Sequence, residues 1–358
     1  FIHIITPGAG AADIHVALHG PLQTAMTYVT AEPIAMNHGF DLPQIKGAAD
    51  LQINLNFPTK HDLKMEQVKV DITGTASDIF IPKAAMGLDL AGGPFALTVK
   101  GNSFDVKGSG QLDGRTAFVA YQEFLKSAGQ AYSSKAAASL SVDPNLRQKL
   151  GMDLSDFLEG SAAVDLTYTQ YQDGRGEADI KADLKQARLF AEPFDYEKPA
   201  GGDAQTSFHA TIKDKTLQSI TDLTATAPGL TVEKSRFDFI RKGEETHLKG
   251  GSISRFVLGE TVAKLDFDYD DAGRVKIVVG GPLFDLRPFL DNEGEKQEPY
   301  QAPPMQISLA ADRLRTAEGE DVQYGKIYAD IDGQGAFNQL EMDAIAGKGD
   351  IYLRYKPD

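Results

Sequence analysis

The stretch Leu51-Gln-Ile-Asn-Leu-Asn-Phe57 alternates apolar and polar residues from end to end. Successive side chains of an extended strand point to opposite faces, so this alternation predicts a β-strand with one apolar and one polar face. Strands of a parallel sheet are covered on both faces and read as continuous apolar runs. The alternation therefore favours antiparallel pairing, with the polar face in water.

The same two-residue period recurs along most of the chain. The further runs are Val68, Val70 and Ile72; Phe95, Leu97 and Val99; Val164, Leu166 and Tyr168; Ile180, Ala182 and Leu184; Phe208, Ala210 and Ile212; Leu265, Phe267 and Tyr269; Val275, Ile277 and Val279; Met305, Ile307 and Leu309; Ile327, Ala329 and Ile331; Met342, Ala344 and Ala346; and Ile351, Leu353 and Tyr355. Turn-forming residues separate the runs, as at Asp173–Arg175 and Asp270–Arg274, which predicts hairpins.

Helical patterns are scarce. Pro144 to Leu150 is the best case, with Asp143 as N-cap and Gly151 just beyond the end, and Asp153 to Leu158 is a second candidate. We expect roughly twenty strands of about nine residues, and open sheets rarely exceed about ten strands without curling, splitting or closing. Since helices are too few to cover the apolar face, the sheet must fold over on itself or bind a ligand.

The sequence therefore predicts a mainly β fold: a long antiparallel meander sheet curled into an elongated hydrophobic groove, a "β-taco", with one or two short helices at about 144–158. We expect residues 1–291 to form one continuous groove segment. An acidic, proline-bearing loop at 292–304 would follow, and residues 305–358 would continue the groove.

Composition narrows the functional classes. The chain of 358 residues has 36 Lys and Arg against 51 Asp and Glu, so its net charge of −15 disfavours binding to nucleic acid or to anionic membrane faces. The absence of Cys removes disulfides, thiolate nucleophiles and Cys-ligated metal sites. No apolar run approaches the roughly 20 residues that cross a bilayer. Because the chain begins with Phe1, we expect it to be a fragment of a longer protein.

Motifs for catalysis or metal binding are absent from the sequence, or the residues around them do not fit the motif. The sequence has no Gly-x-Ser-x-Gly elbow, no phosphate-binding loop and no His-Glu-x-x-His motif. His15 and His19 alternate with apolar residues, which predicts a solvated strand face. Asp266, Asp268 and Asp270 resemble the start of a calcium loop, but the positions that need Gly and Glu hold Asp271 and Ile277. No catalytic residue, metal or cofactor is expected.

Five segments are notable for their order and spacing: Gly110–Phe124, Asp143–Gly151, Leu158–Leu166, Gly280–Leu290 and Met305–Leu314. Together they resemble YhdP-like proteins of the AsmA superfamily, and the resemblance extends from about residue 15 to the end. One departure is Tyr121, where we expect tryptophan in many relatives. The resemblance implies that residues 305–358 begin the AsmA-like C-terminal region, and that the N-terminal anchor and the distal C-terminal part of such proteins lie outside this chain.

The resemblance implies the periplasmic part of a protein anchored in the inner membrane of a Gram-negative bacterium. It implies a non-enzymatic, bridge-like lipid transport protein that carries phospholipid acyl chains along a β-groove towards the outer membrane. The expected partners are phospholipid, the two membranes through parts absent from this chain, and other periplasmic or membrane proteins.

The residues expected to line the groove are the apolar members of the alternating runs. They are Leu51, Ile53, Leu55, Val68, Val70, Ile72, Phe95, Leu97, Val99, Val164, Leu166, Tyr168, Ile180, Leu184, Phe208, Ile212, Leu265, Phe267, Val275, Ile277, Val279, Ile307, Leu309, Ile327, Ile331, Ile351 and Leu353. Three alternatives stay open: an ordinary sandwich core, a periplasmic structural or adhesive β-protein that acts through protein–protein contacts in envelope assembly, and an enzyme of unrecognised type.

Overall fold

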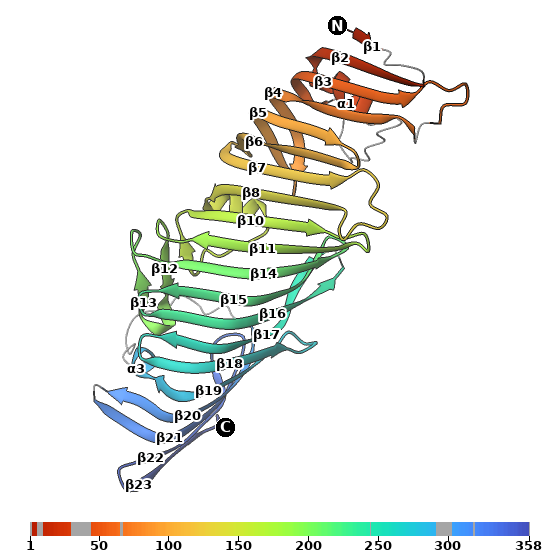
Figure 1. The fold of residues 1–358 in the computed structure, drawn as a ribbon. Coiled ribbons are helices and arrows are strands. Elements are labelled where there is room, and N and C mark those ends of the chain that lie inside the picture. Colours follow the sequence, from red (N-terminus) through yellow and green to blue (C-terminus); the bar gives the residue numbers. More distant parts are fainter. Residues whose placement is uncertain are drawn as a thin grey trace. The chain divides into compact units, whose positions relative to one another are not determined.

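A computed structural model describes residues 2–5, 10–29, 44–64, 67–243, 245–290, 303–317 and 319–357. The fold is mainly β, as predicted, with a few short helices (Figure 1). Among the described residues, 20 strands belong to one large, mostly antiparallel sheet, and β9, β12 and β13 form a separate small sheet. The large sheet is open rather than closed on itself.

The chain divides into two compact units. The first unit comprises Phe1–Val142 and Ala163–Ala178, and the second comprises Asp143–Ala162 and Asp179–Asp358. The elements that lie wholly or partly in the first unit are β1 (Ile2–Ile5), β2 (Ala11–Pro21), α1 (Leu22–Val29), β3 (Lys46–Pro58), β4 (Lys69–Ala85), β5 (Leu88–Lys100), β6 (Ser103–Leu112), β7 (Arg115–Phe124), β8 (Ser134–Val142), β10 (Ala162–Gln170) and β11 (Arg175–Asp183).

The second unit holds the small sheet and the rest of the large one. Its elements are α2 (Pro144–Lys149), β9 (Leu158–Glu159), β12 (Arg188–Ala191), η3 (Glu192–Phe194), β13 (Tyr196–Lys198), β14 (Gln205–Lys213), β15 (Thr216–Ala227), β16 (Leu230–Lys242), β17 (Glu245–Leu258), β18 (Thr261–Tyr269), β19 (Val275–Asp285), α3 (Arg287–Leu290), β20 (Met305–Ala317), β21 (Glu320–Ile331), β22 (Phe337–Ala346) and β23 (Gly349–Tyr355).

Local sequence signals explain several of these elements. Asp143 caps α2, its carboxylate accepting a hydrogen bond from the backbone N–H of Leu146 at 2.8 Å, which confirms the predicted helix. The hairpin between β18 and β19 is also confirmed: the Asp270 carboxylate accepts from the N–H groups of Ala272 and Arg274, both at 2.9 Å. The predicted helix at Asp153–Leu158 is wrong, because the segment forms a turn that leads into β9.

Strand pairing follows the chain, with one exception. Successive strands from β2 to β8 and from β14 to β19 pair antiparallel, as do β20 to β23. β19 and β20 are parallel, with Val275 opposite Met305 and Asp285 opposite Arg315. The expectation of an uninterrupted antiparallel meander is therefore wrong at this point. A parallel pair needs a crossover connection, which accounts for the long segment between these strands.

That connection includes the loop predicted at 292–304. Most of this loop lies outside the described residues, which resume at Pro303. Pro304 then accepts a hydrogen bond from the N–H of Val275 at 2.9 Å, so the pairing with β19 begins at once.

Several strands are longer than expected, and several contain a bulge. β4 has 17 residues and β17 has 14. A bulge inserts a residue that shifts the side chains to the other face and bends the strand. In β4, Ala76 and Ile79 both belong to the core of the first unit although their spacing breaks the alternation, and Asp78 between them has φ 50°.

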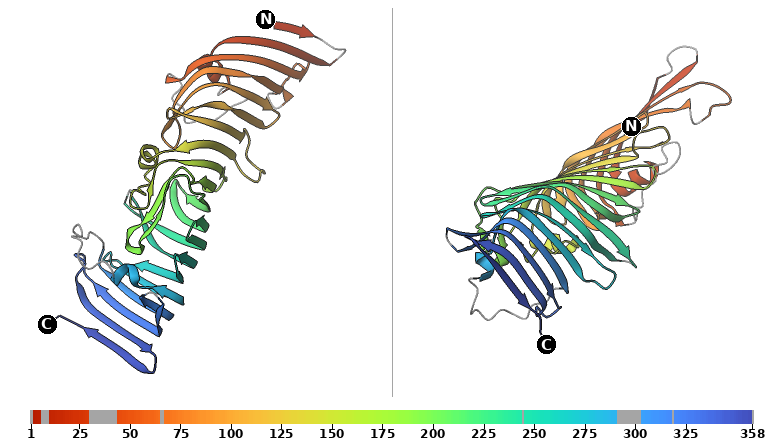
Figure 2. Two further views of the ribbon diagram at one scale, coloured as in Figure 1. Left: turned by 90° about the vertical axis from the view of Figure 1, so that its left-hand side faces the viewer. Right: turned by 90° about the horizontal axis from the view of Figure 1, so that it is seen from below.

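The bulges of the second unit occur in successive strands. Asp222 in β15 and Lys234 in β16 have φ of 53° and 49°, the pairing of β17 with β18 shifts between Ile253 and Phe256, and Tyr324 in β21 has φ 49°. On β20, Leu309, Ala311 and Leu314 all join one core cluster, although Leu314 has the opposite parity. The apolar side therefore stays on one side of the sheet while the strands bend, and Figure 2 shows their curvature.

Glycines let large side chains lie close against neighbouring strands. Phe95 is 1% exposed and its ring lies over Gly108, where a methyl group would stand 2.8 Å from the ring and 2.5 Å from the carbonyl oxygen of Pro94. Gly20, on β2 of the same unit, has no such neighbour within 4 Å.

Gly108→Ala should therefore lower the free energy of unfolding by about 2 kcal/mol or more, since β5 must move to admit the methyl group. Gly20→Ala should change it by less than about 0.5 kcal/mol. Urea denaturation of both variants measures the difference. Equal effects of the two substitutions would contradict the packing of Phe95 on Gly108.

Candidate apolar binding face

The strand register aligns apolar residues into rows across the second unit. One row runs Ile220, Phe237, Gly251, Phe267, Ile277, Ile307, Ala329 and Leu340, each opposite the next on the neighbouring strand. A second runs Ser235, Ile253, Leu265, Val279, Leu309, Ile327, Met342 and Leu353. Both rows lie on one face of the sheet, which we call the apolar face of this unit.

The first unit has corresponding rows. One runs Val16, Ile53, Ile72, Val99 and Phe104, and another runs Leu18, Leu51, Gly74, Leu97, Val106 and Tyr121. These residues form the apolar face of the first unit. Its core cluster includes Leu51, Ile72, Phe95 and Val99.

The predicted lining residues fall into three groups by exposure. Leu51, Ile72, Phe95, Val99, Leu184, Val275, Val279 and Leu309 are buried. Half-buried are Ile53, Leu55, Val68, Val70, Leu97, Val164, Leu166, Tyr168, Ile180, Phe208, Ile212, Leu265, Phe267, Ile277, Ile307, Ile327 and Ile331. Ile351 and Leu353 on β23 are exposed, at 36% and 44%. Val68 and Leu184 lie just outside β4 and β11, and Phe208 lies at a register shift of β14.

The opposite face is polar and exposed. Asn54, Lys69, Asp71 and Lys276, which alternate with the lining residues, are all exposed. His15 contacts Asn54 and His19 contacts Asp50, each across neighbouring strands with an N–O distance of 2.5 Å. The predicted solvated face for both histidines is confirmed.

The aspartate run of β18 shows no metal-binding geometry. Asp266, Asp268 and Asp270 are exposed, and the first two alternate with Leu265 and Phe267 of the apolar face. In the part of the chain that the structure describes, no three His, Asp or Glu side chains are arranged to hold a metal ion.

Short elements cover parts of the apolar faces. In the first unit, α1 packs Leu22, Ala25 and Met26 onto the core beside β3. In the second unit, Phe194 of η3 meets Phe256 of β17 and Phe289 of α3, with ring centroids 6.0 and 5.3 Å apart. Phe289 also stacks on Phe284 of β19 at 6.2 Å. These contacts form an aromatic cluster on the Phe256 side of the bulges, in which Phe289 is 46% exposed.

A second aromatic pair lies on the other side of the bulges. Phe237 and Phe267 flank Gly251, where a methyl group would meet both rings at 2.8 and 3.0 Å, and their centroids are 6.1 Å apart. Together with Ile220, Ile277 and Ile307 they are half-buried. The aromatic cluster around Phe289 and this half-buried surface thus share one face of the same sheet.

Sequence reasoning missed the contributions of β15, β16 and β17. Ile220, Phe237 and Ile253 lie in the apolar rows, but the bulges interrupt the alternation that would have revealed them. Ser235 was missed for the same reason. It is 1% exposed in an apolar row, and its hydroxyl has no hydrogen-bond partner among the described residues.

Two buried cationic side chains of the second unit donate hydrogen bonds to backbone carbonyls. The Lys198 ammonium, in a residue 1% exposed, donates to the carbonyl oxygens of Leu184 and Ala187 at 2.8 and 2.7 Å. Burial lowers the pKa of this ammonium below its ordinary value. Arg147 of α2, 5% exposed, donates to the carbonyl oxygen of Gly160 at 2.8 Å. Both side chains therefore cap backbone carbonyls, which is a structural role.

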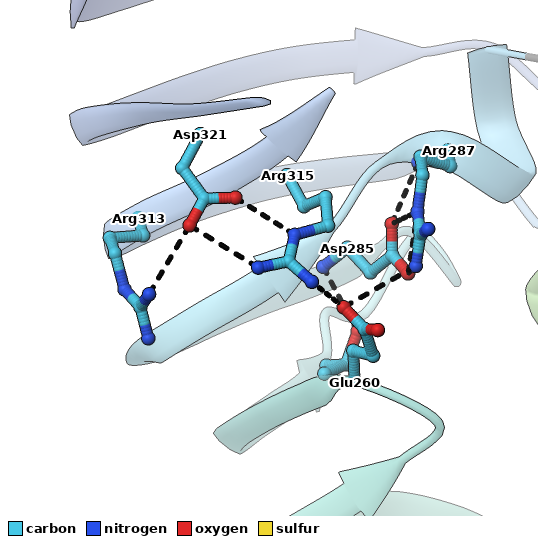
Figure 3. Close-up of polar contacts among 7 residues, drawn as sticks. Glu260, Asp285, Arg287, Arg313, Arg315 and Asp321 are labelled. Carbon is cyan, nitrogen blue, oxygen red and sulfur yellow. Dashed lines mark hydrogen bonds and ion pairs between the residues drawn. The ribbon is translucent and has the colours of Figure 1, made fainter. Parts of the chain in front are cut away.

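An ion-pair network ties together the ends of β17–β21 and the start of α3 (Figure 3). Its labelled members are Glu260, Asp285, Arg287, Arg313, Arg315 and Asp321. Asp285 and Arg287 are 2.7 Å apart, Arg315 and Asp321 are 2.8 Å apart, and Arg315 also pairs with Glu260. Hydrogen bonds from Arg287 lower the pKa of Asp285, and those from Arg315 lower the pKa of Asp321. The three arginines and three carboxylates balance in charge.

No helix in the described residues is both long and apolar enough to cross a membrane. Comparisons with family models, with curated proteins and with solved structures give no match to this chain. The resemblance to YhdP-like proteins therefore stays a prediction.

Asp285→Asn should lower the free energy of unfolding by about 1–3 kcal/mol at pH 7, because a buried charged partner of Arg287 is lost. A carboxyl whose pKa is lowered in the folded state adds stability above its unfolded pKa, and this is lost as pH falls through the folded value. The difference from the unsubstituted protein should therefore be full above about pH 5 and shrink towards pH 2. Urea denaturation across this range measures it.

Asp271→Asn, in the exposed hairpin loop, is the matched control and should change stability by less than about 0.5 kcal/mol at every pH. A destabilisation by Asp285→Asn that stays constant down to pH 2 would contradict the role of the charged form.

Proposed function

We propose that this protein is a non-enzymatic lipid carrier that holds phospholipid acyl chains against the apolar faces of its open sheet. The observation that carries the proposal is the partial exposure of one apolar row in the second unit. The row through Phe237, Phe267, Ile277 and Ile307 is half-buried, whereas the alternating polar positions of the same strands are exposed. An apolar surface that side chains only partly cover is suited to an apolar ligand.

The energetics favour an acyl chain as that ligand. Each methylene taken out of water gains about 0.8 kcal/mol, so burying even half of an acyl chain yields several kcal/mol. The rows offer apolar contact at successive strands about 4.8 Å apart, and a chain lying across them meets similar surface at each step. Such a surface needs no single specific site, so the tail can slide while the charged head stays in water.

Curvature from the bulges supports a groove rather than a flat surface. Bulges in β15, β16 and β21 bend the second unit, and Asp78 marks a bulge in β4 of the first. Each unit would thereby cradle a tail on its concave apolar side. The resemblance to YhdP-like proteins supports a periplasmic location, anchorage in the inner membrane by parts outside this chain, and phospholipid as the cargo.

One observation favours a second candidate function, a structural protein that acts through strand-edge contacts. Every described residue of β23 is exposed, including Tyr352 at 68% and Tyr355 at 51%. β23 pairs with β22, and a strand with a free edge is a template for pairing with another chain. Envelope assembly through protein contacts is the corresponding role.

A photo-crosslinking residue placed at Ile53 or Ile277, in cells labelled with radioactive phosphate, should capture phospholipid. The same residue at the neighbouring polar positions Asn54 or Lys276 should not, because those side chains lie on the opposite face. The labelled, protein-bound lipid is measured on gels. Equal capture on both faces, or none on either, would refute lipid carriage along the apolar faces.

Ile277→Arg should reduce the lipid that co-purifies with the protein by about tenfold, since a charge on the row repels acyl chains. Its cost in stability should stay near 1–2 kcal/mol because the half-buried side chain can extend to water. Lys276→Arg, on the exposed face, is the control and should change neither quantity. Global unfolding of Ile277→Arg in a thermal melt would instead indicate a closed core.

A further inference from the structure

Arg241 differs from the other arginines of this protein. Each of the others either pairs with a carboxylate or, like Arg147, is buried against backbone carbonyls. Arg241 is exposed, and no carboxylate of the described residues lies within ion-pair distance of it. In a chain with a net charge of −15, this cation is available to an anion from outside the protein.

The place of Arg241 is the end of the apolar face of the second unit. Phe237 belongs to the row that continues through Gly251 and Phe267. Phe239 and Arg241 follow it on β16 at steps of two residues, and the register shift beside them skips a residue of β17, so the alternation of β16 is uninterrupted. Phe237, Phe239 and Arg241 therefore share one face, with both rings half-buried.

Two hydrogen bonds position the guanidinium. Its Nε donates to the carbonyl oxygen of Gly243 at 3.0 Å, and one terminal nitrogen donates to the hydroxyl of Thr216 on β15 at 3.4 Å. Thr216 is buried, so the acceptor is held in place by its surroundings. A guanidinium has five N–H donors, and the other three have no partner among the described residues.

The carboxylates beside this end of β16 lie on the other face. Glu245 stands opposite Lys242, which has the opposite parity to Arg241, and the Glu245 carboxylate lies 3.4 Å from the His247 ring. Asp238 also has the opposite parity to Arg241. An anion can therefore reach Arg241 from the apolar face without meeting these carboxylates.

The arrangement suits a molecule with an apolar tail and a phosphate. The planar guanidinium matches two phosphate oxygens with two N–H donors. Arg241 lies two residues, roughly 7 Å, beyond Phe239 along the strand. We propose that Arg241 binds the phosphate of a phospholipid whose acyl chain lies on Phe237 and Phe239. This inference rests on the proposed function and adds the contact that orients the ligand at the end of the face.

A ligand should need both parts in one molecule. A neutral acylglycerol offers only the tail, and a soluble phosphate ester offers only an exposed ion pair, which is weak by itself. All phospholipids carry the phosphate, so ethanolamine and glycerol headgroups should bind alike. Arg241 thus selects phosphate-bearing amphiphiles as a class.

The test is isothermal titration of the full chain, at low ionic strength, with two monomeric amphiphiles of about ten acyl carbons. One is lysophosphatidylglycerol, and the other is the monoacylglycerol with the same chain, which lacks the phosphate. The unsubstituted protein should bind the first about three- to tenfold more tightly. Arg241→Gln should lose this preference and keep its affinity for the monoacylglycerol. Arg241→Lys, which keeps the charge but not the planar fork, should retain part of the preference.

Arg236→Gln is the matched control. Arg236 lies on the same strand with the opposite parity and pairs with Asp238 at 2.6 Å, and its substitution removes the same single charge. This variant should keep the preference. Glycerol phosphate, the phosphate without a tail, should show no binding to the unsubstituted protein up to about 1 mM.

Equal binding of the two amphiphiles, or a preference that survives Arg241→Gln, would overturn the assignment of Arg241 and leave the proposed function standing. Loss of the preference in Arg236→Gln as well would overturn it too, because net charge would then set the preference. Glycerol phosphate binding as tightly as the amphiphile would assign Arg241 to soluble phosphate esters instead of lipid. No binding of either amphiphile would overturn both proposals.

Discussion

A β-strand sends successive side chains to opposite sides, and a sheet built from such strands must shelter whichever side is apolar. In this protein the apolar side of the sheet is only partly covered. α1 covers part of the first unit, and Phe194, Phe256, Phe284 and Phe289 pack together over part of the second. The row through Phe237, Phe267 and Ile277 remains half-buried. The bulges keep both parts of the face on one side of the sheet while the strands bend, so covered and less covered regions coexist on one surface.

The period of two was enough to predict the mainly β fold, the parity of Leu51–Phe57 and the exposed placement of His15 and His19, because each is a property of a single strand or a neighbouring pair. It failed where tertiary structure interrupts the period. Strands β15 to β17 carry bulges at Asp222, Lys234 and the Ile253–Phe256 shift, and no residue preference marks those positions in advance.

The parallel pairing of β19 with β20 depends on how the chain returns across the sheet, which local patterns do not encode. The network around Asp285 assembles residues from β19, α3, β20, β21 and the turn between β17 and β18, and was equally hidden from sequence reasoning.

Charged and apolar residues lie largely on opposite faces of the sheet. The acidic excess of 51 over 36 lies largely with alternating polar positions such as Asp71 and Asp266, which face water and keep anionic surfaces away. In the proposed function, the apolar rows would hold acyl chains by burial alone and without a specific site.

The central claim is that an acyl chain binds by burial against the apolar faces, and the dependence of affinity on chain length tests it most directly. Isothermal titration of the full chain with monomeric single-chain phospholipids, differing only by methylenes from about 8 to about 12 carbons, gives a dissociation constant for each length. The account predicts that the constant falls about two- to fourfold with every added methylene, with a negative heat-capacity change that grows in step. A dissociation constant that does not change with chain length would contradict it.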